Sequence, residues 1–373
     1  MSWLTDYAEV AKRTDRFTDN AEHIALLAAG LMGEAGSVLT ELKKEERERD
    51  AYPAYRHRML EEIGDFLWYF VRLVSVVDGD LLVQLEAPSI IEARRKDLRA
   101  LPLFLEFGAA VGELLAAIGK GNADSSQAVR SLLLRIWNLF FAVAREAQVP
   151  LQTAAASNVK KIENRWPSER VYSGLFDSEF PEEEQLPRWL EVEFLERSRG
   201  EQKVVILRCN GINFGDRLTD NIIDPDGYRY HDIFHFAHAV HLGWSPLVRS
   251  LLRCKRKSSP RVDEAEDGAR AVILEEAITA IVFSRAKQLS FFDGLDHLDY
   301  DLLKTVHEFV QGYEVESVPL WQWEAAIVDG YSIFRKLRGN RGGRVVMNLK
   351  RRELAYIAPD SEASAAMAAR RQH

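Results

Sequence analysis

The chain has 373 residues, 47% of them hydrophobic and 28% charged, which is the composition of a globular protein long enough for two domains. Its 57 acidic residues outnumber 49 basic ones, and the net charge of -8 disfavours a nucleic-acid coat or a membrane-surface role. Cys209 and Cys254 stand in unrelated contexts and indicate neither a disulfide framework nor a zinc site. Without an N-terminal signal or a run of 18 apolar residues, we expect a cytoplasmic protein that does not span a membrane.

Residues 3–166 have apolar positions recurring every three and four residues, which is typical of helices. The pattern predicts a long helix capped by Asp19 or Asn20 that ends near Glu46, and a second helix that opens at Pro53. Further helices are predicted at about 81–99, 103–119, 124–147 and 150–165. The expected fold of residues 1–170 is therefore an all-α helical bundle.

The first two of these helices carry acidic residues on faces that are otherwise apolar. Glu34 and Glu41 are seven residues apart and lie within roughly 20° of one another around the helix. Glu62 and Asp65, three residues apart on the next helix, also share a face. Antiparallel packing would bring these carboxylates together, where they would repel one another unless a cation bound them. A hard cation such as Mg²⁺ suits an all-oxygen site of this kind.

A plainer interpretation is that each acid lies on the outer face of an ordinary helix, which is the commoner case for any single glutamate. For the whole set, the neighbouring apolar residues favour the first interpretation. Leu31 and Val38 in the first helix, and Phe66 and Leu67 in the second, leave little purely polar surface around the acids.

Three sequence motifs resemble the MazG-type all-α nucleoside triphosphate pyrophosphohydrolases. They are Gly-Leu-x-Gly-Glu-Ala-Gly at 30–36, Lys-Lys at 43–44 and Glu-x-Gly-Asp-x-Leu-Trp-Tyr at 62–69. In that family a Glu-x-x-Glu pair and a Glu-x-x-Asp pair bind Mg²⁺, and Glu34, Glu62 and Asp65 match by position. Ser37 stands where the family has its second glutamate. Glu41, further along the same face, is our candidate replacement.

The resemblance also implies a set of substrate-binding residues. Asn158, Lys161 and Arg165 are similar to the family's C-terminal Asn, Lys and Arg signature, which meets phosphates or nucleotide. Lys44 is expected to offset the charge of the triphosphate.

The activity that the resemblance implies is Mg²⁺-dependent hydrolysis of an NTP or dNTP to the nucleoside monophosphate and pyrophosphate. Glu34, Glu41, Glu62 and Asp65 are the expected metal ligands and catalytic residues. Glu41 or Glu61 would accept the proton of the attacking water.

A degenerate internal repeat is also predicted, because residues 111–120 align with 35–44 and residues 133–141 align with 60–68. The second copy has Ala110, Arg135 and Asn138 at the positions of Glu34, Glu62 and Asp65, and Glu113 at that of Ser37. We interpret the first domain as a tandem bundle, or covalent pseudo-dimer, with one working site. Chance alignment of two amphipathic helix pairs is the alternative.

Residues 171–187 are predicted to be a linker, followed by a mostly helical α+β domain at 188–358. Its expected elements are a β-hairpin of 189–196 and 202–208, helices at about 230–254, 264–288, 299–313 and 318–337, and short strands at 344–348 and 353–357. The tail at 359–373, rich in Ala, Ser, Arg and Gln, is predicted to be disordered.

Four of the nine histidines fall between residues 231 and 241. On a helix, three of them lie within about 60°, with an aspartate and a histidine at the flanks: His231, His235 and His238, then Asp232 and His241. Such a stripe could ligate a transition metal with Glu275 or Glu276, ionise near neutral pH, or bond to core groups. The His-Asp pair is similar to that of HD-type phosphohydrolases, which need an earlier histidine that this chain lacks between His57 and His231.

Three hypotheses about function therefore stand. The first is an Mg²⁺-dependent pyrophosphohydrolase with a nucleoside triphosphate as its partner, either monomeric or a homo-oligomer. The second is a nucleotide-binding sensor or assembly module, in which Ser37 marks a weak or inactive site that signals to the C-terminal domain. The third makes the histidine-rich domain the catalyst and the bundle its regulator.

Overall fold

The computed structural model describes residues 3–17, 22–85, 100–120, 127–200 and 202–359. The chain divides into two compact units, Met1–Ser168 and Glu169–His373. The predicted fold class is confirmed, since an all-helical region is followed by an α+β region. The predicted disordered tail, most of the helix predicted at 81–99 and the start of that at 124–147 lie outside the described residues.

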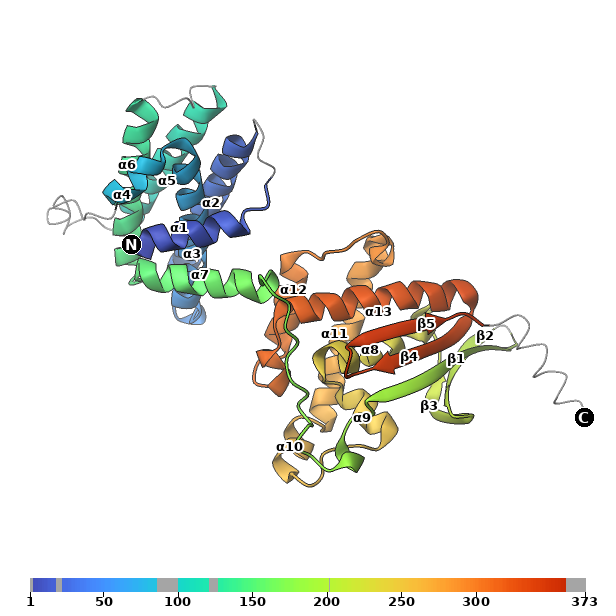
Figure 1. Cartoon of the computed structure of the whole chain (residues 1–373). Coiled ribbons are helices and arrows are strands. Elements are labelled where there is room, and N and C mark those ends of the chain that lie inside the picture. The colour runs from blue at the N-terminus through green and yellow to red at the C-terminus, as the bar shows by residue number, and fades with distance from the viewer. Residues whose placement is uncertain (1–2, 18–21, 86–99, 121–126, 201, 360–373) are drawn as a thin grey trace, which may run out of the picture. The chain divides into compact units, whose positions relative to one another are not determined.

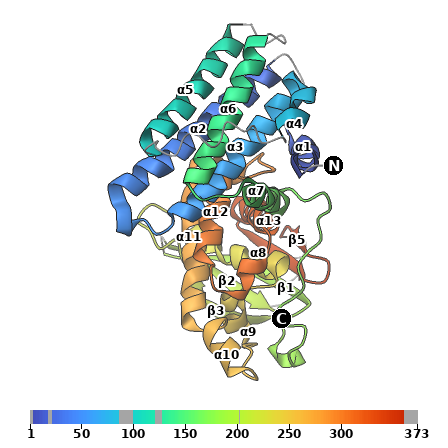
Figure 2. The same ribbon diagram turned by 90° about the vertical axis from the view of Figure 1, so that its left-hand side faces the viewer.

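The described residues of the N-terminal unit form helices (Figure 1). They are α1 (Trp3–Thr14), α2 (His23–Glu48), α3 (Tyr55–Val77), α4 (Gly79–Leu85), α5 (Ala100–Gly119), α6 (Gln127–Glu146) and α7 (Leu151–Arg165), with a 3-10 turn, η1 (Arg49–Ala51), between α2 and α3. Helix α2 packs against α3 and α5, and α5 packs against α6. Figure 2 shows these four helices running side by side.

One aromatic core joins the two helix pairs of this unit. Phe66 of α3 has its ring centroid 4.9 Å from that of Phe107 of α5 and 4.5 Å from that of Phe140 of α6. All three rings are fully buried. Because burial of such rings is the main driving force for packing, α2–α3 and α5–α6 form a single bundle rather than two separate hairpins.

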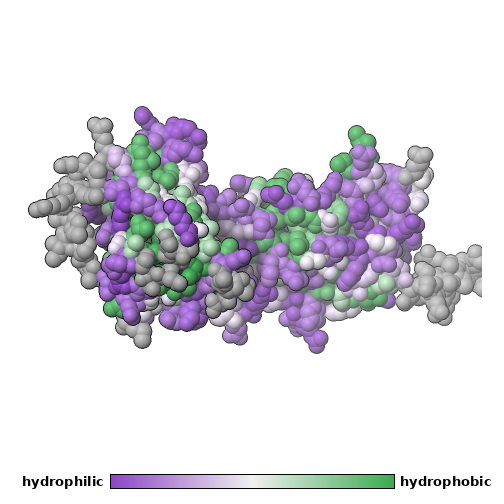
Figure 3. Space-filling view, turned by 90° about the horizontal axis from the view of Figure 1, so that it is seen from above, coloured by the Kyte–Doolittle hydropathy of each residue, from purple (hydrophilic) through white to green (hydrophobic). Residues whose placement is uncertain are grey.

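Two helices of this unit, His23–Ala51 and Leu101–Gly119, are long and apolar enough to cross a membrane by length and composition alone. Both also supply the core of the unit, for example Val38 from α2 and Leu114 from α5. Core helices of soluble proteins pass the same test, so this composition is weak evidence for a membrane. On the face seen in Figure 3, hydrophilic residues cover much of each unit, with hydrophobic areas between them.

The C-terminal unit contains a five-stranded antiparallel sheet with the order β3-β2-β1-β4-β5. The strands are β1 (Trp189–Arg199), β2 (Gln202–Cys209), β3 (Ile212–Leu218), β4 (Gly342–Asn348) and β5 (Glu353–Ile357). Both predicted strand pairs are confirmed. The sequence prediction missed β3, and it missed that β1 pairs with β4 to join the pairs into one sheet.

Most helices of this unit are shorter than the sequence predicts. They are α8 (Asp232–Leu242), α9 (Pro246–Leu252), α10 (Pro260–Ala265), α11 (Ala269–Gln288), α12 (Tyr300–Phe309) and α13 (Leu320–Asn340). Helix α13, in contrast, begins and ends slightly later than predicted. The single helix predicted at 230–254 is wrong, because Gly243 ends α8 in a left-handed conformation with φ 68° and Pro246 opens α9.

Helices α8 and α13 pack on each other and on the strands β4 and β5 (Figure 1). The ring of Phe236 on α8 meets that of Phe194 on β1 at 6.0 Å. Every residue of α8 is buried, including its aspartate and three histidines. Polar side chains on a wholly buried helix need partners inside the protein, which makes α8 the place to look for a site.

Residues 171–187, predicted to be a linker, pack into the C-terminal unit. Asp177 is fully buried, accepts a hydrogen bond from the backbone N–H of Leu186 at 2.7 Å, and pairs with Arg188 at 2.8 Å and Arg249 at 2.7 Å. These contacts tie the segment to β1 and α9, so it is part of the second unit.

Candidate functional site

Glu34 on α2 and Glu62 and Asp65 on α3 converge in the N-terminal unit. One carboxylate oxygen from each lies within 4.8 Å of the other two, and all three side chains are partly exposed. The convergence that their spacing predicts is confirmed. Their role as metal ligands stays a prediction.

Helix α7 adds polar partners to this carboxylate cluster, which we define as Glu34, Glu62 and Asp65. The side-chain amide of Asn158 donates to Oδ1 of Asp65 at 2.7 Å, and Nζ of Lys161 donates to the same oxygen at 2.5 Å. The hydroxyl of Tyr7 donates to Oδ1 of Asn158 at 2.8 Å and so orients the amide. Asn158 and Lys161 thus lie beside the cluster, and their contact with phosphate or nucleotide stays a prediction, whereas no motif pointed to Tyr7.

Gly64 explains how α7 comes this close to Asp65. A Cβ atom at this position would lie 2.9 Å from the carbonyl oxygen of Ala154 and 3.1 Å from Cβ of Asn158. Only glycine leaves room for that backbone contact between α3 and α7. The glycine therefore sets the distance across which Asn158 and Lys161 reach Asp65.

Burial and mutual repulsion shape the electrostatics of the cluster. Burial, together with the charges of neighbouring acids, raises the pKa of Glu34 and of Glu62 to about 7. Burial also raises the pKa of Asp65, although the Lys161 ammonium opposes the change. Glu34 and Glu62 are therefore partly protonated near neutral pH in the absence of another cation.

Glu41 does not join the cluster. Among the described residues, the group of mutually close ligand atoms contains Glu34, Glu62 and Asp65 without it. Seven residues advance a helix by about 10 Å, so Glu41 shares a face with Glu34 but lies too far along the axis to share an ion. Its buried carboxylate instead accepts hydrogen bonds from Lys44 at 2.6 Å and from the hydroxyl of Tyr52.

The remaining predicted residues lie around these contacts. Lys44 is bound to Glu41, and the guanidinium of Arg165 lies 4.3 Å from the ring centroid of Trp166. Glu61 lies 3.8 Å from Nζ of Lys161, which also contacts Asp65, and 3.6 Å from the guanidinium of Arg58. Glu61 therefore lies at the edge of the cluster.

An open pocket lies at the α2–α3 connection, next to Tyr52. Tyr55, Arg49 and Arg56 line it together with Tyr52 and several acids. Aromatic rings and guanidinium groups are suited to stacking and to contacts with phosphate.

The second helix pair has an ion pair where the first has carboxylates. Glu113 on α5 and Arg135 on α6, aligned with Ser37 and Glu62, bind each other at 2.9 Å with both side chains well exposed. Glu113 and Arg135 neutralise each other's charge, so this pair needs no metal ion.

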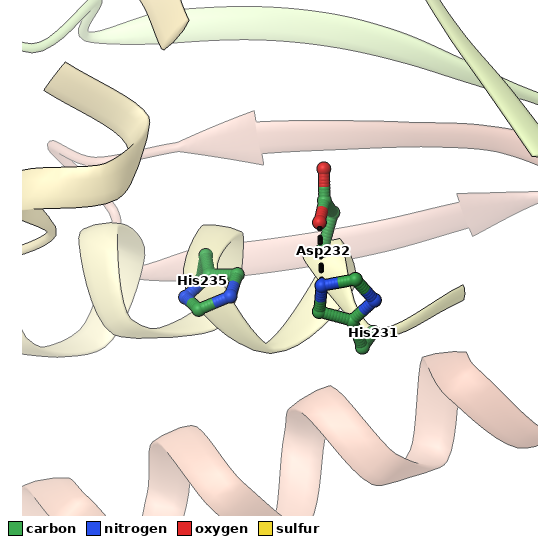
Figure 4. Close-up of side chains that lie close together, drawn as sticks. All are labelled: His231, Asp232 and His235. Atoms are coloured by element: carbon green, nitrogen blue, oxygen red, sulfur yellow. Dashed lines mark ion pairs between the residues drawn. The ribbon is translucent and has the colours of Figure 1, made fainter. Parts of the chain in front are cut away.

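The histidines of the C-terminal unit form a second polar cluster. The ring centroids of His231 and His235 are 5.8 Å apart and those of His235 and His238 are 6.2 Å apart. Two groups of close ligand atoms result, His231 with Asp232 and His235, and His235 with His238 and Glu275. Figure 4 shows the first group at the start of α8. The clustering predicted from the helical spacing is confirmed.

Glu275 on α11 is the anchor of the second group. It is fully buried and accepts hydrogen bonds from Oγ of Ser245 at 2.8 Å, from the backbone N–H of Leu247 at 3.0 Å and from Nδ1 of His238 at 3.2 Å. Burial opposes its ionisation, but His235 and His238 outweigh this and lower its pKa. Burial alone would lower the pKa of His235. The charge of Glu275 outweighs burial, so the pKa of His235 is raised.

His241 takes no part in either group. Its Nδ1 accepts from the hydroxyl of Tyr172 at 3.0 Å, and its Nε2 lies 2.9 Å from Oδ2 of Asp329. Both ring nitrogens are therefore used by neighbouring side chains, as the interpretation based on core hydrogen bonds expects.

Comparison with known proteins identifies the family of the C-terminal unit. The family model described as the MazG C-terminal domain matches residues 171–360. The pyrophosphohydrolase domain that the N-terminal motifs resemble is not detected. Gene 37 protein of Mycobacterium phage L5 is 32% identical over 62 residues, which is 16% of this chain and 54% of that protein, so the match spans about half of this relative. No solved structure matches the chain.

Proposed function

Because this chain belongs to the family of the MazG C-terminal domain, we propose that its N-terminal unit hydrolyses nucleoside triphosphates to the monophosphate and pyrophosphate with Mg²⁺. The observation that carries the proposal is the convergence of Glu34, Glu62 and Asp65 within 4.8 Å. The motifs around these residues are those that resemble the pyrophosphohydrolases.

The donor atoms of the cluster fit Mg²⁺. All three side chains offer carboxylate oxygens, which this ion prefers, and their partial exposure leaves space for water and phosphate. The pKa values of Glu34 and Glu62 are raised because the ionised carboxylates are buried near other acids, and a bound divalent cation would stabilise their ionised form. When bound, Mg²⁺ supplies charge against the triphosphate and makes water a nucleophile at neutral pH.

The chain's own residues would position the substrate and accept a proton. Lys161 places an ammonium beside Asp65, where it can meet phosphate oxygens, and Asn158 holds Asp65 in place. We assign proton acceptance to Glu61 rather than Glu41, because Glu61 lies at the edge of the cluster and meets Arg58 and Lys161 only at 3.6 and 3.8 Å, whereas Glu41 accepts short hydrogen bonds from Lys44 and Tyr52.

The deciding experiment incubates the purified full chain with a panel of NTPs and dNTPs plus Mg²⁺ and measures pyrophosphate and monophosphate. We expect release from at least one substrate and a loss of at least about 100-fold in Glu62→Gln and in Asp65→Asn. Glu113→Gln is the matched control, since this acid lies in the second helix pair and should leave turnover unchanged. Absence of pyrophosphate with every substrate, or equal release by both variants, would refute the proposal.

A nucleotide-binding sensor is the second candidate, and Ser37 is the observation that favours it. The cluster has three carboxylates where the resembled family has four, which weakens the hold on metal. Calorimetric titration of the same substrate panel separates the two functions, because a sensor binds a nucleotide and releases no pyrophosphate.

A further inference from the structure

The start of α8 brings potential ligand atoms of His231, Asp232 and His235 within 4.8 Å of one another (Figure 4), independently of the carboxylate cluster in the other unit. Nε2 of His231 lies 3.2 Å from Oδ1 of Asp232, and Oε2 of Glu276 lies beside this group, 4.0 Å from Nε2 of His231 and 3.5 Å from Nε2 of His235. Two atoms that each bind a metal at about 2.1 Å are separated by about 3.0 to 4.2 Å, depending on the bond angle. The three distances fall within this range.

Both histidines turn the same ring nitrogen toward this point. Nδ1 of His231 donates to the carbonyl oxygen of Tyr228 at 2.9 Å, and the Tyr228 ring stacks on the imidazole at 4.3 Å. Nδ1 of His235 faces Oε1 of Glu275 at 3.0 Å. Metal-binding histidines commonly present one nitrogen to a carbonyl or carboxylate in this way, which leaves the lone pair of the other free for the ion.

His235 supplies a second, separate reason to expect a ligand. Its side chain is fully buried, yet neither ring nitrogen makes a hydrogen bond of acceptable geometry with the described residues. Its Nε2 is aimed at Glu276 across 3.5 Å, which is longer than a normal hydrogen bond. A buried imidazole without such a bond is costly unless something else occupies the position between these atoms.

The local chain keeps these groups in place without a metal. Gly227, with φ 95°, begins the 3-10 turn η4 (Tyr228–Tyr230), and its N–H donates to Asp220 at 2.6 Å. Arg229 binds both Asp220 and Glu196, each at 2.8 Å. The turn that carries Tyr228 and leads into His231 is therefore fixed to the sheet through Glu196 of β1.

We propose that His231, Asp232, His235 and Glu276 bind one divalent transition-metal ion in the C-terminal unit, with Glu275 as the carboxylate that orients His235. Two imidazole nitrogens with two carboxylate oxygens suit Zn²⁺, Mn²⁺, Fe²⁺ or Co²⁺ better than Mg²⁺ or Ca²⁺. The Glu276 side chain is 38% exposed, whereas the other three are nearly buried, so the ion enters at Glu276.

The test uses the full chain carrying Glu62→Gln and Asp65→Asn, so that the N-terminal carboxylates do not contribute. The protein is stripped with EDTA, dialysed, and titrated with Co²⁺ and then Zn²⁺, with visible absorption and elemental analysis as readouts. We expect one ion per chain and the visible Co²⁺ bands that nitrogen and oxygen ligands produce. Added Zn²⁺ should abolish these bands, since it binds the same ligands more tightly than Co²⁺.

The variants locate the ion. His235→Gln should lose the bands, and Glu276→Gln should weaken binding by at least about tenfold without disturbing the core, because its side chain lies at the edge. His241→Gln is the matched control, a buried histidine of the same helix with its own partners, and should retain the metal.

If His235→Gln fails to fold by circular dichroism, Glu276→Gln decides. No uptake of Co²⁺ or Zn²⁺ by the stripped parent would overturn the proposal and leave the cluster as a network of ion pairs. Uptake by Glu276→Gln equal to that of its parent would overturn the assigned ligand set.

Discussion

In the N-terminal unit three carboxylates face one another, whereas in the C-terminal unit carboxylates face histidines. Burial raises the pKa of Glu34 and Glu62 to about 7, because the nearest charges are mostly negative. Burial acts on Glu275 in the same direction, yet the pKa of Glu275 is lowered, because His235 and His238 bind it. The sign of the neighbouring charge, rather than the depth of burial, decides the protonation state.

The difference indicates what each cluster is suited to. The N-terminal carboxylates are destabilised by one another and gain from a cation supplied from outside. In the C-terminal cluster His235, whose pKa Glu275 raises, already serves as a cation, so an ion must replace its proton there. Neutralising a carboxylate should consequently have opposite effects on the stability of the two units.

The largest expected effect comes from Glu275→Gln. Removing this buried charge leaves the His235 cation without its counterion and weakens the hydrogen bond from His238, and we expect the free energy of unfolding of the C-terminal unit to fall by about 3 to 5 kcal/mol. Urea denaturation of the full chain, analysed for two transitions, measures it. Glu276→Gln is the control, and its more exposed side chain should cost far less. Equal losses in the two variants would contradict the role of Glu275.

The second effect is a pH dependence of the metal-free N-terminal unit. Folded Glu34 and Glu62 retain protons up to about pH 7, while the unfolded chain releases them near the ordinary value of 4.5. The folded state then binds more protons, so stability falls as pH rises from 4.5 to 7, by roughly 1 kcal/mol per carboxylate after allowance for solvent screening. Thermal unfolding across this range, with and without Mg²⁺, measures it.

Mg²⁺ should remove that decline, since the ion favours the ionised carboxylates. A stability that rises between pH 4.5 and 7 in the absence of metal would show that the acids do not share one environment.

The third prediction concerns Glu62→Gln alone. Removing one of the repelling acids should stabilise the metal-free N-terminal unit at pH 8 by roughly 1 kcal/mol, even though hydrolysis is lost. Chemical denaturation and the pyrophosphate assay are run on the same preparation. Glu113→Gln, which breaks only an exposed ion pair, should change neither quantity appreciably. Destabilisation by Glu62→Gln would mean that this glutamate has a structural role.

The smallest effect is expected from Lys161→Met. Loss of the ammonium beside Asp65 should tighten the binding of Mg²⁺ to the nucleotide-free protein by a few-fold, while turnover falls. Lys160→Met is the control, because Lys160 is the adjacent, exposed lysine. Calorimetric titration with Mg²⁺ compares the two. Weaker Mg²⁺ binding in Lys161→Met would indicate that Lys161 supports the cluster rather than competing with metal.

Local periodicity accounts for what the sequence predicted well. Glu62 and Asp65 are one turn apart, and His231, His235 and His238 follow the helical repeat, so their convergence needs only that the helices form and pack. The same reasoning failed for Glu41, because angular position around a helix says nothing about distance along it. Tyr52, whose hydroxyl donates to Glu41, lies beyond the end of α2, and no local sequence pattern predicts this contact.

Non-local pairing accounts for most of what was missed in the fold. Strand β3 is largely exposed on both faces, so it has no alternation of apolar and polar residues to reveal it. The pairing of β1 with β4 joins segments about 150 residues apart. Tyr7 likewise reaches Asn158 from the other end of the N-terminal unit.

Lys161 supplies positive charge to the carboxylate cluster from within the protein. Its ammonium rests on Asp65 and near Glu61, so a free Mg²⁺ ion must compete with a charge that the protein cannot release into solution. A Mg²⁺–nucleotide complex brings a cation for the acids and, at the same moment, phosphate oxygens for the displaced lysine. If the cluster binds Mg²⁺ as we propose, it should therefore bind the Mg²⁺–nucleotide complex more readily than the free ion.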